Sequence, residues 1–372
     1  MFRSLLVILL LLLISNPSFS QTSFPEENVS FDEKIGQMLL AGFRGTALAD
    51  TNHIVRDIKK YHLGGVILFD YDVPSKSSER NIQSAEQLKT LISNLKKLSD
   101  IPLTIAIDQE GGQVARLKPS LGFPEIKSAE YLGQLDNVDS TRFYAQKMGQ
   151  TLADLGINMN FAPVVDLNTN PKNPVIGGLE RSFSANPGKV VKHASIYIET
   201  LNKHGIWSVL KHFPGHGSSK KDSHLGVVDV TKTWSKKELI PYRKLINKDL
   251  GNAIMTAHIF NHNIDPDYPA TLSKPTITGL LRNKLNYNDV VISDDLMMGA
   301  IRNEYGLKTT INKAINAGVD ILVFANNSIY DPDIVPKAHK IIHNLVDEGK
   351  ITREQIERSY QRIISLKNKQ GE

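Results

Sequence analysis

The sequence contains no cysteine among its 372 residues. Disulfide bonds, thiolate metal ligands and a cysteine nucleophile are therefore excluded, and burial of apolar side chains has to stabilise the fold. The sequence also lacks an internal repeat, a low-complexity tract and a linker that would separate two domains. Barrels built from eight β/α units commonly form one domain at this length, so a single domain is expected.

Clusters of like charge and long apolar runs are scarce as well. The 44 Lys and Arg residues exceed the 39 Asp and Glu residues only slightly, and because they are scattered along the chain no nucleic-acid partner is expected. The apolar run at residues 5–14 is shorter than the roughly 20 residues that cross a bilayer. Arg3 precedes this run and small residues follow it, so residues 1–20 are predicted to be a cleaved signal peptide. Residues 21–372 would then form an exported domain, periplasmic or secreted, without stable membrane insertion.

Short β-rich runs alternate with longer amphipathic stretches through the rest of the chain. Most runs consist of Val, Ile, Leu and Ala, as in strands that are buried on both faces of a parallel sheet. We place eight strands, at residues 38–43, 65–69, 103–107, 160–165, 207–210, 253–257, 290–292 and 321–324. This alternation predicts an α/β fold with a single (β/α)8 barrel of the TIM type.

Helices are expected between these strands. Apolar residues between positions 82 and 98 recur on one face of a helix. Three pairs with capping-box spacing mark further helix starts, the last for a helix that runs to about residue 366: Ser30 with Glu33, Ser235 with Glu238, and Thr352 with Gln355. Residues 167–187 are rich in Pro, Asn and Gly and directly follow a predicted strand, so we interpret them as an active-site loop.

Polar residues gather where the predicted strands end. Most are acidic, amide or imidazole side chains: Asp108, Gln109, Glu110, Asp166, Lys211, His212, His258, Ser293, Asp294, Asp295, Asn326 and Asn327. In a (β/α)8 barrel the carboxyl ends of the strands converge on one mouth, which is where the active sites of such enzymes lie. The sequence therefore predicts an enzyme with its site at this mouth.

The densest group of polar residues follows the fifth strand. Its members are Lys211, His212, His216, Asp222 and His224. The imidazoles and the carboxylate could be metal ligands, but the ammonium of Lys211 opposes a cation, and Pro214 breaks the helix that a His-x-x-x-His pair would need. We favour a loop for sugar binding and proton transfer, in which Asp222 orients His224. A metal site and a purely structural loop are the alternatives, and no metal or cofactor is expected.

Two carboxylates at other strand ends complete the candidate site. Asp294 follows an apolar strand and is the candidate nucleophile, whereas Asp295 is interpreted as the N-cap of the next helix. Asp108 would accept hydrogen bonds from sugar hydroxyls, with Arg116 and Arg181 as donors, and Glu110 would be a structural hydrogen-bonding residue. The glycines after Glu110 lack the spacing and the Lys of a phosphate-binding loop, so nucleotide binding is not expected. Asp166, His258 and Asn326 could line the pocket or make structural hydrogen bonds.

These segments resemble glycoside hydrolase family 3, and within it the bacterial β-N-acetylglucosaminidases. The resemblance runs from about residue 31 to residue 366 and rests on five segments, at residues 106–112, 161–166, 180–183, 211–217 with 222–224, and 293–298. The Lys-His-Phe-Pro-Gly-His-Gly segment followed by Asp-Ser-His is the most specific of them. It is similar to the subgroup that uses a His/Asp pair in place of a carboxylic acid as acid/base.

The resemblance implies a role for each matching residue. Asp294 would be the nucleophile, His224 the acid/base and Asp222 its partner, in a retaining enzyme that removes terminal N-acetyl-β-hexosamine. The terminal sugar would be held by Asp108, Arg116, Arg181, Lys211 and His212. Gln113 stands where relatives often have Arg, and the predicted export signal differs from the relatives that act in the cytoplasm. The substrate would then be an extracellular or periplasmic glycan.

Two other functions remain open at this point. A phosphorylase of the same fold would use phosphate in place of water, and an imidazole acid/base would not repel that anion. A non-catalytic glycan-binding protein is the second alternative, although the set of Asp294, His224 and Asp222 favours an enzyme. The sequence gives no oligomeric state.

Overall fold

The computed structural model describes residues 29–223 and 225–369. The predicted signal peptide, residues 1–20, and the predicted acid/base His224 lie outside the described residues. Within the described ranges, none of the helices combines the length and the apolar character needed to cross a membrane.

In this part of the chain, eight parallel strands form one sheet in the order β10-β1-β2-β3-β4-β5-β7-β9. They are β1 (Leu39–Gly42), β2 (Gly65–Leu68), β3 (Thr104–Ile107), β4 (Met159–Asn160), β5 (Trp207–Phe213), β7 (Ala253–Thr256), β9 (Val290–Ile292) and β10 (Leu322–Phe324). β10 pairs in register with β1, and a parallel bridge between Ile292 and Ile321 joins β9 to the segment that leads into β10. The sheet therefore closes on itself, which confirms the predicted single (β/α)8 barrel.

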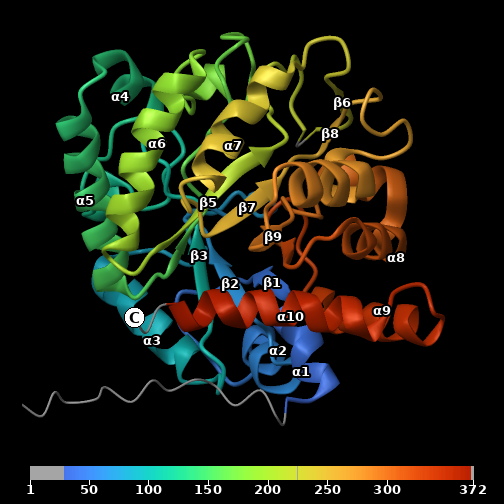
Figure 1. Cartoon of the computed structure of the whole chain (residues 1–372). Helices are drawn as coiled ribbons and strands as arrows, with labels where there is room; N and C mark the ends of the chain where they lie inside the picture. Colours follow the sequence, from blue (N-terminus) through green and yellow to red (C-terminus); the bar gives the residue numbers. More distant parts are fainter. Residues whose placement is uncertain (1–28, 224, 370–372) are drawn as a thin grey trace, which may run out of the picture.

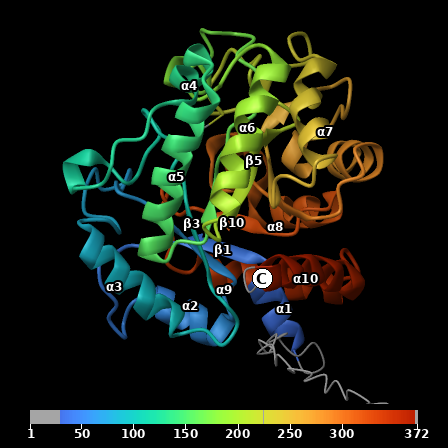
Figure 2. The same ribbon diagram turned by 60° about the vertical axis from the view of Figure 1, so that its left-hand side comes forward.

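Helices surround the barrel on all the sides visible in Figures 1 and 2. The α-helices are α1 (Phe31–Gln37), α2 (His53–Tyr61), α3 (Ala85–Lys96), α4 (Ala129–Leu135), α5 (Val138–Leu155), α6 (Pro187–Asn202), α7 (Ile240–Ile246), α8 (Gly299–Ala317), α9 (Ile334–Asp347) and α10 (Arg353–Asn368). A π-helix, η6 (Pro275–Lys284), takes the position between β7 and β9. The short 3-10 helices are η2 (Pro119–Leu121), η3 (Gly177–Leu179), η4 (Lys236–Leu239) and η5 (Ala270–Leu272). Two short strands, β6 (Val228–Asp229) and β8 (Ile259–Phe260), pair with each other outside the barrel.

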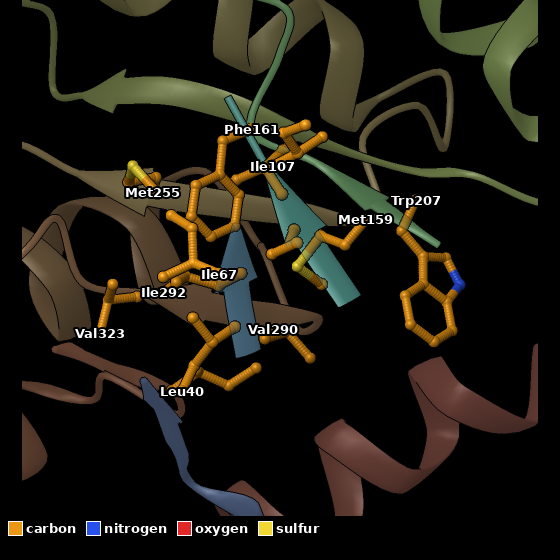
Figure 3. Packing of buried hydrophobic residues seen from close by; sticks show 14 of the residues in the cluster. Leu40, Ile67, Ile107, Met159, Phe161, Trp207, Met255, Val290, Ile292 and Val323 are labelled. Carbon is orange, nitrogen blue, oxygen red and sulfur yellow. The ribbon is translucent and has the colours of Figure 1, made fainter. Parts of the chain in front are cut away.

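Side chains from many strands fill the barrel interior. Figure 3 shows Ile67 of β2, Phe161 after β4 and Ile292 of β9 among them, and each is at most 2% exposed. Burying side chains of this size stabilises a fold by roughly 1.5–3 kcal/mol each. Ile67 and Phe161 also line the pocket described below, so the top of the core forms the apolar floor of the site.

Local sequence signals place most of the helices. The capping boxes Ser30/Glu33 and Thr352/Gln355 are both formed, at the starts of α1 and α10. Ser235 is the N-cap of η4, so the predicted helix start is confirmed, but its side chain makes no cap hydrogen bond and the capping box with Glu238 is not formed. The fourth strand is shorter than the predicted residues 160–165, because β4 covers only Met159–Asn160. Pro163 has no N–H to continue the hydrogen bonds between strands, and in the rest of the predicted strand the described structure has a single β-bridge, from Val164 to Lys211.

Candidate active site

A pocket of about 360 Å³ opens at the carboxyl ends of the barrel strands. Its floor is apolar, and its polar lining comes from the end of β5 and from the segments after β3, β4, β5, β9 and β10; it includes Asp108, Arg116, Arg181, Lys211, His212, His216, Ser223, Asp294, Asp295 and Asn327. A pocket of this size and mixed lining is typical of small-molecule sites in this fold. All five residues that we expected to bind sugar line it, together with Asp294.

Buried ion pairs connect the charged residues on one wall. The Lys211 ammonium lies 2.8 Å from Asp108 Oδ1 and 2.7 Å from Glu110 Oε1, with its side chain 2% exposed. The Arg181 guanidinium donates two hydrogen bonds to Glu110, Nε to Oε2 at 2.8 Å and Nη2 to Oε1 at 2.7 Å. Burying so many charges is costly unless each is paired, so these contacts fix the side chains in place. Glu110 thus has the structural hydrogen-bonding role that we predicted.

Asp108 stays ionised in this wall. Burial acts to raise its pKa, but the positive charges of Lys211 and Arg116 outweigh burial and hold the pKa well below the usual range. Arg116 Nη2 lies 3.5 Å from Asp108 Oδ2, and the Arg116 guanidinium also stacks over the Phe69 ring. The pocket therefore presents a carboxylate and a guanidinium side by side. The carboxylate can accept hydrogen bonds from vicinal hydroxyl groups of a ligand, and the guanidinium can donate hydrogen bonds to them.

His212 is held neutral in one tautomer. Its Nδ1 lies 2.7 Å from Asp166 Oδ2, and Arg181 Nη2 lies 3.3 Å from its Nε2. Burial, and next the charge of Arg181, lower the pKa of His212 well below its usual value. The Nδ1 proton therefore points to Asp166, and Nε2 accepts from the guanidinium. A ring fixed in this way can hold a ligand but is poorly suited to exchange protons or to bind a metal ion next to Arg181.

The loop after β5 is anchored at both sides of residue 224. The His216 ring contacts Ser219 Oγ through Nδ1 at 2.7 Å and Ser223 Oγ through Nε2 at 3.3 Å. The Leu225 N–H donates to the Asp222 carbonyl at 3.2 Å, which closes a tight turn. Gly217 is needed here, since a Cβ on it would lie 1.7 Å from the Leu167 carbonyl oxygen. Ser223, directly before His224, lines the pocket.

Asp294 and Asp295 follow β9 and have different surroundings. Asp294 lines the pocket, and its Oδ1 accepts from the Asp295 N–H at 2.8 Å. Asp295 Oδ1 accepts from Met297 N at 3.0 Å and from Ala325 N at 2.9 Å. Helix α8 has Met298 as its N-cap, without a side-chain hydrogen bond, so the interpretation of Asp295 as that N-cap is wrong. Asp295 instead ties the turn after β9 to the end of β10.

Three other residues at strand ends have structural hydrogen bonds. Asp166 is 1% exposed and also accepts from the main-chain N–H groups of His212 and His216. The His258 ring lies between Thr271 Oγ1 and the Asp295 carbonyl oxygen, and Asn326 bonds to main-chain groups on either side of it. The structural alternative that we left open therefore holds for Asp166, His258 and Asn326.

The sequence did not indicate the apolar part of the pocket. Beyond the floor, the lining includes Phe69, Tyr71, Val73, Met255 and Met298. Tyr71 and Val73 are 41% and 53% exposed, at the rim. Residues of these types occur throughout a core, so nothing in their pattern separates a pocket-lining side chain from an ordinary buried one.

Glu238 accepts a hydrogen bond from the loop after β5 and has a raised pKa. Its side chain is 1% exposed, and Oε2 accepts from Gly217 N at 3.1 Å. Burial, with a further contribution from the Asp166 carboxylate, raises the pKa of Glu238 to about 8. The folded protein therefore keeps this proton at neutral pH, whereas an unfolded chain loses it near pH 4.3.

This difference predicts a pH-dependent stability that Glu238→Gln should remove. In the parent protein the free energy of unfolding should fall as the pH rises from about 4.5 to about 8, by up to about 1.4 kcal/mol per pH unit from this group. Gln keeps an acceptor for Gly217 but does not ionise, so the variant should gain stability relative to the parent as the pH rises. Urea unfolding at pH 5, 6.5 and 8 would measure this, and parallel profiles for the two proteins would contradict it.

Comparisons with known proteins agree with this geometry. The family model "Glycosyl hydrolase family 3 N terminal domain" matches residues 30–366. The chain is 36% identical over 338 residues to "Beta-hexosaminidase A" of Pseudoalteromonas piscicida, covering 84% of this chain and 54% of that protein. It is 33% identical over 304 residues to "Beta-hexosaminidase" of Nitrosomonas eutropha, covering 79% of this chain and 81% of that protein.

Solved structures are similar over nearly the whole described chain. A glycoside hydrolase family 3 β-N-acetylglucosaminidase from Paenibacillus sp. str. FPU-7 aligns with a TM-score of 0.84 at 33% identity, covering 92% of this chain and 63% of that one. The β-N-acetylhexosaminidase of Beutenbergia cavernae aligns with a TM-score of 0.82 at 25% identity, covering 91% of this chain and 99% of that one. This chain thus spans about half the length of the Pseudoalteromonas relative but nearly all of the Beutenbergia chain.

Proposed function

We propose, from the premise that this chain belongs to glycoside hydrolase family 3, that it is a retaining exo-β-N-acetylhexosaminidase. Its substrate would be a glycan that carries a terminal, non-reducing N-acetyl-β-D-glucosamine. The relatives named above include β-hexosaminidases and β-N-acetylglucosaminidases, and they support this substrate class.

The observation that carries the proposal is the pocket with Asp294 on its lining and a buried wall of paired charges. Arg116, Arg181 and Lys211 each contact a carboxylate, and Asp108 is kept ionised, so donors and acceptors for sugar hydroxyls are fixed before a ligand arrives. A site that is organised in this way loses little entropy when it binds. The small volume of the pocket favours one terminal sugar and therefore exo action.

The first step of the proposed reaction forms a bond between Asp294 and the anomeric carbon. A carboxylate oxygen of Asp294 attacks C1 while the C1–O bond to the leaving group breaks. The leaving oxygen takes its proton from the imidazolium of His224. The wall of charges holds the hydroxyl groups of the sugar, and neutral His212 adds a fixed imidazole that does not compete for the proton.

The second step releases the sugar. Neutral His224 takes a proton from water as the water oxygen attacks C1, and the bond from C1 to Asp294 breaks. Asp222 would accept a hydrogen bond from the other imidazole nitrogen and stabilise the imidazolium. The pocket-lining Ser223, which is next to residue 224 in the sequence, supports this role.

A comparison of two chromogenic substrates tests the proposal. The purified protein should hydrolyse an aryl N-acetyl-β-glucosaminide with a kcat/KM at least about 100-fold above that of the matching β-glucoside, since polar recognition gives strong discrimination. Asp294→Asn, prepared in parallel, controls for contaminating hydrolases. Equal rates on the two substrates would overturn the substrate assignment, and release of sugar 1-phosphate in phosphate buffer would identify a phosphorylase.

We also propose that the protein acts outside the cytoplasm, on periplasmic or extracellular glycans. The proposal rests on the charged start, apolar run and small residues of positions 1–20. Fractionation of cells that express the full chain, with sequencing of the mature N-terminus, would test it.

A further inference from the structure

A second group of potential ligands lies outside the set of residues that line the pocket. Asp32 on α1 and His339 and His343 on α9 each offer one ligand atom, and these atoms all lie within 4.8 Å of one another. Across residues 29–223 and 225–369, no other group of three or more His, Asp or Glu side chains gathers its ligand atoms in this way. The proposed reaction uses none of the three.

The three side chains are held by their neighbours. His343 Nε2 lies 2.6 Å from Asp32 Oδ1, and His339 Nε2 lies 3.2 Å from the Asp32 carbonyl oxygen. The spacing of four residues puts both imidazoles on one face of α9, with ring centroids 5.1 Å apart. Phe31 meets the His343 ring edge-on at 5.3 Å, and Tyr61 meets His339 at the same distance. The rings therefore face Asp32 with little freedom to turn away.

Two imidazole nitrogens and one carboxylate oxygen are a donor set that suits zinc. Such a set commonly leaves the fourth tetrahedral position to water, and two His one turn apart on a helix form a good chelate. The Asp32 and His343 side chains are 59% and 34% exposed, which leaves the site open to solvent ions.

We propose that Asp32, His339 and His343 form a binding site for a divalent transition-metal ion, with zinc as the best fit. Tetrahedral ligands at zinc distances lie about 3.4 Å apart. The ion would take the place of the direct Asp32–His343 contact and draw the three ligand atoms around itself. It would join α1, which leads into β1, to α9, which returns from β10.

The site lies at the other face of the barrel from the pocket. Helix α1 precedes β1, so it lies at the amino ends of the strands, and α9 runs back from the carboxyl end of β10 toward that face. Figure 1 shows α1 close to α9 and α10, and the helices α1 and α9 are in contact. A bound ion would thus anchor α1, the first helix in the described part of the chain, away from the proposed reaction.

Zinc titration of the full, chelator-treated chain tests the proposal. Zinc at about 100 times its dissociation constant should raise the Tm by roughly 4 °C. Asp32→Asn and His343→Asn should each lower zinc affinity at least about 10-fold and so remove about half of that shift or more. The matched control is His262→Asn, since His262 is an exposed histidine outside this group, and it should keep the full shift.

Cobalt(II) gives a second measurement that does not depend on stability. Wild-type protein should show the visible absorption bands of tetrahedral cobalt, and His343→Asn should lose them. Hydrolysis of the chromogenic substrate without added metal should be unchanged in both site variants, so this test and that of the proposed function succeed or fail separately. No Tm shift with zinc, or a shift and cobalt spectrum that persist in both variants, would overturn the proposal and leave Asp32 and His343 as a hydrogen-bonded pair.

Discussion

Replacing Asp294 with Asn should lower kcat on an N-acetyl-β-hexosaminide by about 10⁴-fold, the scale on which enzymes lose rate when a nucleophile is removed. The amide oxygen can still accept from the Asp295 N–H, so the turn after β9 should keep its shape. What is lost is the negative charge that attacks C1, and KM should change far less than kcat. Initial rates with both variant and parent at saturating substrate measure this.

The covalent intermediate offers a direct check on the same residue. A slow 2-acetamido-5-fluoro glycosyl donor should add one sugar mass to the peptide that contains Asp294. Asp295→Asn is the matched control, because its amide oxygen can still accept from Met297 and Ala325 and the label on Asp294 should therefore persist. Label on Asp295 or on Glu110 would show that the nucleophile has been misassigned, as would a kcat for Asp294→Asn within 10-fold of the parent.

Much of the barrel could be predicted because strand and helix signals in this sequence are local. Val290–Ile292 is a fully buried apolar run, and the structure gives that strand the predicted bounds. The fourth strand departs from prediction where Pro163 interrupts the ladder, and this departure too has a local cause. The closing of the sheet follows from eight such units, since parallel strands with covering helices bury both faces.

The capping predictions were wrong where the side chain forms a hydrogen bond with a residue far along the sequence. Glu238 has the right spacing for a capping box with Ser235, but its carboxylate instead accepts a hydrogen bond from the N–H of Gly217. Asp295 has the right position for an N-cap, but it bonds to Ala325 of the neighbouring strand end. Spacing alone cannot show such competition, because the competing donor is fixed only when the barrel closes.

The candidate site was predictable to the extent that strand ends converge. Asp108, Lys211 and Asp294 follow different strands and line one pocket, as the barrel geometry requires. The pairing among them was not predictable. Lys211 forms ion pairs with both Asp108 and Glu110, and Arg181 forms one with Glu110. These pairs depend on side-chain conformations, which the spacing of residues in the sequence does not encode.

The proposed pair of Asp222 and His224 should behave as one unit when it is mutated. General acid–base catalysis by one side chain contributes roughly 10²–10⁴-fold, so His224→Ala should lose about that much on a substrate with a poor leaving group. Asp222→Ala should lose a large part of the same factor. The double variant should be little worse than His224→Ala, because an orienting carboxylate then has no imidazole to orient. Lys221→Ala, at an exposed neighbour on the same loop, is the control and should keep the parent rate.

An aryl glycoside whose leaving group needs no proton separates this chemistry from a binding role. The first step should be nearly unchanged in all three variants, while hydrolysis of the glycosyl intermediate, which still needs a base, should be slow. Rapid-mixing experiments should therefore show a burst of aryl product followed by a slow steady rate. Losses that multiply in the double variant, without a burst, would mean that His224 binds sugar or holds the loop. The proton would then have to come from another residue of the pocket wall, and Glu110, which accepts from both Arg181 and Lys211, would be the first to test.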